Sequence, residues 1–300
     1  MCVDLPPWSS AMSIEHPTHS TRTSLPERRN KWAAAGAGAA VGLLGGMIGL
    51  GGAEFRLPLL IGLFGFLALE AVILNKAMSL LVVATALPAR LVAVPLEQLT
   101  PHWPIIVNLL TGSLLGAYLG ATWATRMRNR TLHRVLAILL ILIAAALLVT
   151  HLGRVQPAEL QGPLQTITGV AAGAGIGVVA ALMGVAGGEL LIPTIVLLYG
   201  ADIKIAGSLS LAVSLPTMLV AFSRYSRDAS FVVLRDHRPF VVAMTVGSIA
   251  GTLAGGLMVG VAPTTLLVPL LVVLLLASAV KVWRHGAAVP VVSGPTPPMP

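Results

Sequence analysis

Charged residues are scarce in this sequence. Only 10% of the 300 residues are Asp, Glu, Lys or Arg, whereas 56% are hydrophobic. A soluble domain carries roughly 25% charged residues, because a surface that faces water needs them. The composition therefore predicts an integral membrane protein, in which apolar runs cross the hydrocarbon layer as helices.

Cysteine is also nearly absent, because Cys2 is the only one, so an intramolecular disulfide is excluded. No group of Cys and His has the spacing of a metal site, and we expect no metal and no cofactor. The formal net charge of +8 would suggest nucleic-acid binding in a soluble protein. Here the basic residues stand at the ends of apolar runs, where orientation in a bilayer explains them, and no nucleic-acid partner is expected.

One unusual stretch occurs twice. Residues 49–58 read GLGGAEFRLP and residues 184–193 read GVAGGELLIP, and the two align without a gap. The chain is therefore an internal duplication. The aligned positions are Gly49 with Gly184, Gly52 with Gly187, Glu54 with Glu189, and Pro58 with Pro193.

Each copy of this stretch predicts a broken helix. An apolar run, 33–48 or 165–183, meets glycines, a carboxylate and then a proline. A glycine costs roughly 1 kcal/mol inside a helix, and a proline removes a backbone donor and clashes with the preceding turn. Freed backbone groups cannot face lipid, so they must be buried in protein or line a wet cavity. Paired breaks in two halves of a chain point to the binding site of a transporter.

The rest of the chain divides into two similar sets of apolar runs, about eight segments in all. Apart from the two broken segments, the runs are roughly long enough to cross ~30 Å of hydrocarbon. We expect disordered tails and a short connector around two transmembrane repeats. The broken segments are 33–68 and 165–200, and the other runs are 70–94, 104–125, 132–150, 204–222, 240–260 and 264–283. The predicted units are 1–32 (tail), 33–150 (first repeat), 151–164 (connector), 165–285 (second repeat) and 286–300 (tail).

The distribution of Lys and Arg predicts the orientation. Short cytoplasmic loops hold an excess of both, and here they gather in the amino-terminal tail, in 126–134, in 223–239 and near the carboxyl terminus. Both termini should then be cytoplasmic. Three apolar segments separate successive basic loops, so one segment of each three must enter and leave on the same side. We assign this re-entrant path to the broken segments, which makes the two repeats inverted. The alternative is that one basic loop misleads and both broken segments cross.

The duplicated G-x-G-G-x-E-x-x-x-P stretch, followed each time by an apolar run with Ser near its start, resembles the sulfite exporter TauE/SafE family of membrane permeases. The downstream segments here are Ala77-Met78-Ser79-Leu80 and Ala206-Gly207-Ser208-Leu209. The resemblance covers roughly 33–285. It implies a multi-pass protein of the cell membrane that exports or imports a small sulfur-containing anion, such as sulfite or an organosulfonate.

The broken segments could bind an anion without any lysine. An unwound glycine-rich backbone presents consecutive N–H donors, and the amino terminus of a half-helix adds a partial charge of roughly +0.5. The alternative is that the glycines let helices pack closely, which we favour for the glycines elsewhere in the chain. The candidate substrate-binding residues are Gly49, Gly51, Gly52, Glu54, Arg56, Pro58, Ser79, Gly184, Gly187, Gly188, Glu189, Pro193, Ser208 and Ser210.

The charged residues of the broken segments allow two interpretations each. Glu54 and Glu189 could carry a coupling proton or cap the half-helices that begin beside them. Because Glu189 lacks a basic neighbour in the sequence, we expect it to carry the proton and Glu54 to be a fixed charge. Arg56 could contact the substrate or pair locally with a carboxylate. Lys76, in the next run, is expected to extend to the membrane interface.

A membrane-embedded enzyme is the competing class of function. It would need a nucleophile with a base, or a metal cluster, at membrane depth. The histidines stand in loops or at the ends of runs, and no such group is visible, so the sequence predicts no enzyme. A passive anion channel remains an alternative, because the same donors could serve a channel. The expected partners are a small anion, a coupling proton and membrane lipid.

Overall fold

The computed structural model describes residues 30–48, 52–93, 96–151, 162–257 and 264–287. Within these ranges every regular element is a helix, which confirms the predicted all-α class. The predicted tail 1–32 lies almost wholly outside the described residues, as do most of the connector 151–164 and of the tail 286–300. At both tail boundaries a helix extends two residues beyond the predicted limit of its repeat.

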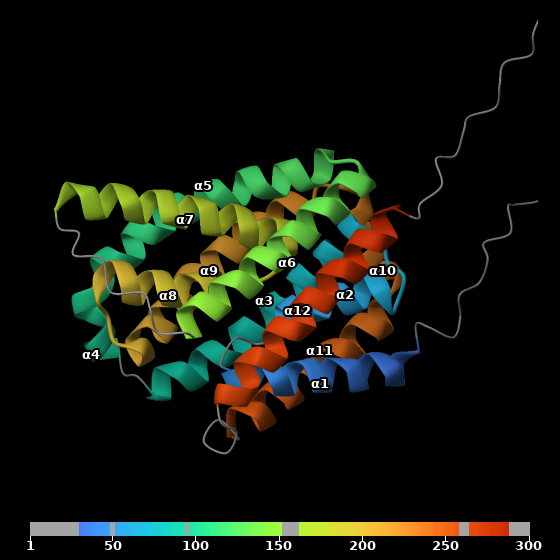
Figure 1. Cartoon of the computed structure of the whole chain (residues 1–300), viewed down its shortest axis with the longest axis horizontal. Coiled ribbons are helices and arrows are strands. Elements are labelled where there is room, and N and C mark those ends of the chain that lie inside the picture. Colours follow the sequence, from blue (N-terminus) through green and yellow to red (C-terminus); the bar gives the residue numbers. More distant parts are fainter. Residues whose placement is uncertain (1–29, 49–51, 94–95, 152–161, 258–263, 288–300) are drawn as a thin grey trace, which may run out of the picture.

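The two repeats contain the same series of helices (Figure 1). The first consists of α1 (Lys31–Ile48), α2 (Ala53–Gly62), α3 (Ala68–Ala93), α4 (Leu96–Leu99), η1 (Thr100–His102), α5 (Trp103–Arg126) and α6 (Asn129–His151). The second consists of α7 (Pro163–Met183), α8 (Gly188–Tyr199), α9 (Ile203–Tyr225), η2 (Ala229–Val232), α10 (Val233–Asp236), α11 (Arg238–Leu257) and α12 (Thr264–Ala287). The short elements α4, η1, η2 and α10 lie in segments that the sequence predicts as loops.

Both predicted breaks are present. The first lies between α1 and α2, and the second between α7 and α8, so each repeat opens with a pair of helices in place of one. Among the described residues, five helical stretches are long and apolar enough to cross a membrane, and α8 is a shorter apolar helix. The five are Ala68–Thr85, Glu97–Arg126, Asn129–Ala146, Pro163–Met183 and Ile205–Tyr225.

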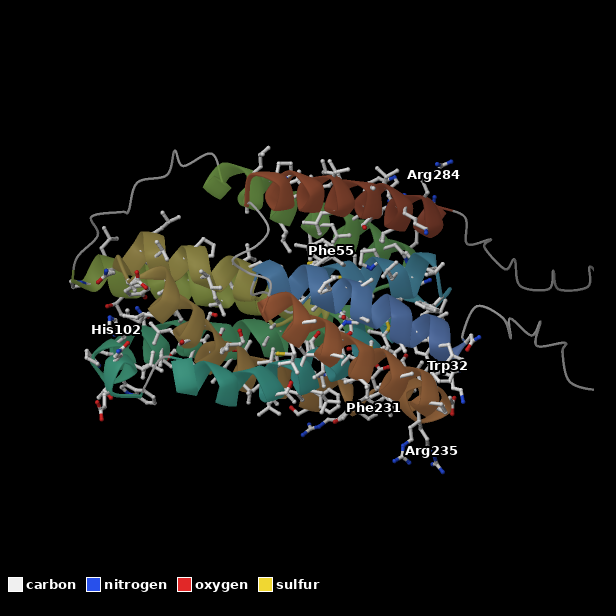
Figure 2. The ribbon with its side chains drawn as sticks, turned by 90° about the horizontal axis from the view of Figure 1, so that it is seen from below. Trp32, Phe55, His102, Phe231, Arg235 and Arg284 are labelled. Atoms are coloured by element: carbon white, nitrogen blue, oxygen red, sulfur yellow. The ribbon has the colours of Figure 1, made fainter. Side chains whose placement is uncertain are left out.

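The two repeats run in opposite directions. His102, between α3 and α5, lies at one end of the molecule (Figure 2). Arg235, in the equivalent connection between α9 and α11, lies at the other end, together with Trp32 at the start of α1 and Arg284 near the end of α12. Phe55, in the first turn of α2, lies between the two ends. The first break therefore sits within the bundle, far from both of its ends.

Small residues hold the repeats together along two equivalent seams. Helix α1 packs on α11, and α5 packs on α7, so the first helix of each repeat lies against the same later helix of the other. A Cβ atom on Gly42 or Gly251 would collide with a backbone carbonyl across the first seam, and one on Gly116 or Gly177 would do so across the second. These contacts agree with the packing role predicted for the glycines outside the breaks.

Candidate functional site

The two helix breaks have the same backbone geometry. Gly52 precedes α2 with φ 73°, and Gly187 precedes α8 with φ 83°, both in the left-handed region that favours glycine. The carbonyl of each glycine accepts hydrogen bonds from the N–H groups three and four residues later. No side chain caps either helix start. The duplicated stretch thus builds two helix amino termini whose N-cap glycines provide no side-chain cap.

Both of these glycines also lie against the helix that precedes the break. A Cβ on Gly52 would collide with the carbonyl oxygen of Val41 in α1. A Cβ on Gly187 would stand 3.1 Å from Cβ of Ala180 in α7. Close packing and the positive φ therefore both require glycine at these positions. By contrast, a Cβ on Gly188 would meet no atom within 4 Å.

The remaining glycines of the candidate list differ in what can be said of them. Gly184 has φ 70° and ends α7, and a Cβ there would collide with the carbonyl oxygen of Val72 in α3. Gly49 and Gly51 lie outside the described residues. At the described glycines, the breaks therefore pack closely against α1, α3 and α7.

The two glutamates meet between the repeats. Glu54 lies in the first turn of α2 and Glu189 in the first turn of α8, with exposed fractions of only 2% and 5%. Their carboxyl groups are within hydrogen-bonding reach of each other, and each also lies beside its own backbone N–H. No N–H or O–H of another described residue donates to any of their four carboxyl oxygens. The duplication has therefore brought its two carboxylates into one buried pair.

Arg56 is completely buried one half-turn further along α2. Its guanidinium donates to Oγ of Ser79 at 3.4 Å and to Oγ of Ser248 at 3.5 Å, and its Nε has no partner among the described residues. Both hydroxyl contacts are long for hydrogen bonds, which cluster near 2.9 Å. The guanidinium interacts electrostatically with Glu54, but no hydrogen bond joins the two side chains. Most of its five donors are thus available inside the bundle.

Lys76 corrects one expectation from the sequence. It does not extend to the membrane interface but is completely buried in α3. Its Nζ donates to the carbonyl oxygens of Ala180 at 2.8 Å and Val185 at 2.6 Å, at the carboxyl end of α7. A cation at that end is stabilised by the negative end of the helix dipole. Lys76 also interacts with the charge of Glu189, so Glu189 does have a basic neighbour.

Asn75, which is not among the predicted site residues, joins the two breaks directly. Its Nδ2 donates to the carbonyl of Ala53, just after the first break, at 3.0 Å. It also donates to the carbonyl of Met183, just before the second break, at 3.2 Å. An asparagine beside a lysine within an apolar helix is the only signal that could have identified it.

The serines and prolines of the candidate list have unequal positions. Of the three predicted serines, Ser79 contacts the guanidinium of Arg56. Ser210 donates to the backbone carbonyl of Gly207 at 2.9 Å, within its own helix, and Ser208 is buried in α9. Pro58 and Pro193 lie inside α2 and α8, where each follows its glutamate by one turn.

The site is not symmetric, although the fold nearly is. Ser248 in α11 corresponds to Ser113 in α5. Each serine directly follows one seam glycine and stands three residues before another. Ser248 contacts Arg56, whereas Ser113 forms a 2.7 Å hydrogen bond with Oγ1 of Thr217. Leu191 stands in the second repeat where Arg56 stands in the first. The basic groups of the centre, Arg56 and Lys76, therefore both come from the first repeat.

Inverted repeats whose interrupted helices meet inside a membrane bundle define the class of secondary transporters. Comparison with protein families agrees with this class. The family model described as "Sulfite exporter TauE/SafE" matches residues 8–147 and again residues 141–282. The chain therefore belongs to the TauE/SafE family of membrane transporters, and each half corresponds to one copy of the family's repeat. No curated protein and no solved structure matches the chain.

Proposed function

We propose that this protein is a permease of the cell membrane that carries a small sulfur-containing oxyanion, sulfite or an organosulfonate, through the centre of the bundle. The observation that supports this most directly is the buried guanidinium of Arg56, which no carboxylate of the described residues neutralises by hydrogen bonding. A buried cation is costly unless a partner of opposite charge accompanies it. A bound oxyanion would supply that partner.

The chemistry of the groups around Arg56 suits such an anion. A planar guanidinium can donate two parallel hydrogen bonds to two oxygens of one sulfonate group. Ser79 and Ser248 stand beside it as hydroxyl donors. The amino terminus of α2 contributes the positive end of the helix dipole. In the second repeat, Gly188 leaves open space at the start of α8, where the backbone itself can be approached.

The burial of the site favours a transporter over a passive channel. Glu54, Arg56, Ser79 and Glu189 are all at most 5% exposed, so these side chains are shielded from bulk water in this conformation. A channel needs a continuous open path, whereas alternating access passes through a closed state. The carboxyl pair also provides a site for a coupling proton. The rival channel function predicts that, when the membrane potential is held at zero, the anion does not accumulate above its external concentration.

Flux measurements in proteoliposomes test this function. We expect Arg56→Gln to reduce sulfite transport at least ~10-fold, since a hydrogen bond to a charged group contributes about 1.5–3 kcal/mol. Arg56→Lys should recover only part of the rate, because an ammonium group cannot donate the paired hydrogen bonds. Arg227→Gln, at an exposed position, is the matched control and should transport normally. Wild-type rates in the folded Arg56→Gln variant would refute the assignment. Accumulation under an imposed proton gradient separates a transporter from a channel.

A further inference from the structure

We propose that Glu54 and Glu189 share one proton in the empty site, and that a doubly charged anion takes up a second proton when it binds, whereas a singly charged anion does not. The proposal rests on the proposed function, because it assumes that the anion binds beside Arg56. It assigns the proton to the pair as a unit, not to Glu189 alone. It also makes the coupling depend on the charge of the substrate.

The shared proton follows from the geometry of the pair. Two ionised carboxylates are both acceptors and repel each other, so two facing carboxyl groups can hydrogen bond only if one of them carries a proton. Both side chains are at least 95% buried, and no other described donor satisfies their oxygens. No N–H or O–H group of another described residue therefore links the two carboxyl groups. The two groups titrate as one unit.

The second proton follows from the charges around the pair. Arg56 on α2 contributes +1, because a guanidinium stays protonated. We assign +1 to Lys76 on α3 as well, since its Nζ lies beside the charge of Glu189 and donates to the carbonyls of Ala180 and Val185. The pair with one proton contributes −1. The empty site thus holds a net charge of +1, which one monovalent anion neutralises. A divalent anion leaves one negative charge in a low-dielectric region, and protonation of the second carboxyl removes it.

No other described group interferes with this balance. The remaining charged or titratable side chains on the helices packed against α2 and α8 lie toward the ends of their helices, away from the breaks. They are Lys31 on α1, Glu70 on α3, Arg130, His133 and Arg134 on α6, Arg224 on α9, and Lys281 and Arg284 on α12. Tyr225 on α9 lies nearer the second break, but it is a neutral phenol that donates its hydroxyl to the carbonyl of Ala181 at 2.9 Å. Lys281 reaches α2, but at Gly62, the end opposite the break. The charge at the centre is therefore set by four side chains and the anion.

Sulfate and methanesulfonate provide the probes, because they are similar in size and differ by one charge. Binding to the purified full chain is measured by titration calorimetry in buffers of different ionisation enthalpy, which counts the protons taken up. We expect about one more proton per sulfate than per methanesulfonate. Raising the pH by one unit should then weaken sulfate binding up to ~10-fold relative to methanesulfonate. Equal proton uptake for the two anions would overturn the proposal.

Glutamine substitutions distinguish a shared proton from a single carrier. Glu54→Gln and Glu189→Gln each mimic the pair with one fixed proton, so both should keep the difference between the anions. The double variant should lose it, and the exposed Glu97→Gln control should match the wild type. Loss in Glu189→Gln but not in Glu54→Gln would assign the proton to Glu189 alone and refute the shared unit. A requirement for Na⁺ in place of protons would also refute it. Failure of the wild type to bind either anion would instead contradict the proposed function.

Discussion

Replacement of Lys76 by methionine tests whether the first repeat holds the second break in place. The substitution keeps a long side chain of similar volume but removes the ammonium group. The carbonyl of Ala180 still accepts a hydrogen bond from the N–H of Val185 at 3.0 Å. The carbonyl of Val185 loses the 2.6 Å hydrogen bond from Nζ. We therefore expect Lys76→Met to weaken the junction between α7 and α8 more than it weakens the rest of the bundle.

The magnitude follows from the two lost hydrogen bonds. A hydrogen bond to a charged group contributes about 1.5–3 kcal/mol, and a buried carbonyl left unpaired costs about 1–3 kcal/mol. Because one of the two carbonyls keeps another donor, the free energy of unfolding should fall by about 3 kcal/mol. On the scale of soluble domains of this length, that corresponds to a decrease in Tm of roughly 6–12 °C.

Thermal unfolding of the purified protein in detergent measures this effect. Lys31→Met, at an exposed position at the start of α1, is the control and should unfold like the wild type. Combining Lys76→Met with Glu189→Gln removes both opposite charges, so the double variant should recover part of the loss. A decrease in Tm of less than 2 °C corresponds to a loss of less than about 1 kcal/mol in the free energy of unfolding. Such a small decrease in Lys76→Met would show that the two hydrogen bonds do not stabilise the break.

Three further predictions concern the frame of the site. Gly251→Val should prevent recovery of folded protein, because its side chain would collide with α1. Gly36→Val should be tolerated, since no atom lies within 4 Å of its added Cβ. Equal yields of the two variants in size-exclusion chromatography would contradict this prediction. Asn75→Leu should remove the amide that donates to the carbonyls of Ala53 and Met183, and the free energy of unfolding should fall by about 2 kcal/mol. An unchanged Tm would contradict this prediction. Cysteines introduced at Asn129 and Ser230 should react with an impermeant maleimide only from the cytoplasmic side, and labelling of one of them from outside intact cells would refute the inverted topology.

Much of the fold could be predicted from the sequence because it depends on local properties. Apolar runs of sufficient length become helices in a membrane whatever surrounds them. Glycine and proline interrupt helices through their own backbone preferences, so both breaks could be located at Gly52 and Gly187. The duplication itself is a property of the sequence. The short helices between α3 and α5 and between α9 and α11 were missed, because brief polar segments carry little periodic signal.

The site depended on contacts that no local pattern contains. Arg56 and Ser248 are 192 positions apart, and their contact exists because α2 and α11 converge inside the bundle. The sequence predicted that Lys76 extends to the interface, since a lone lysine in an apolar helix usually lowers its free energy in that way. Only the packed structure brings it to the carboxyl end of α7, where two carbonyls compensate for its burial.

The amino-acid sequence alone thus determined the helical class, the two repeats, the positions of the breaks and the residues from which a site could be built. The tertiary structure decided which of those residues face one another. It paired Glu54 with Glu189 and placed Lys76 beside Glu189, because inverted repeats bring the starts of α2 and α8 together from opposite halves of the chain. Burial and pairing are properties of the whole assembly, and they set the charge at its centre.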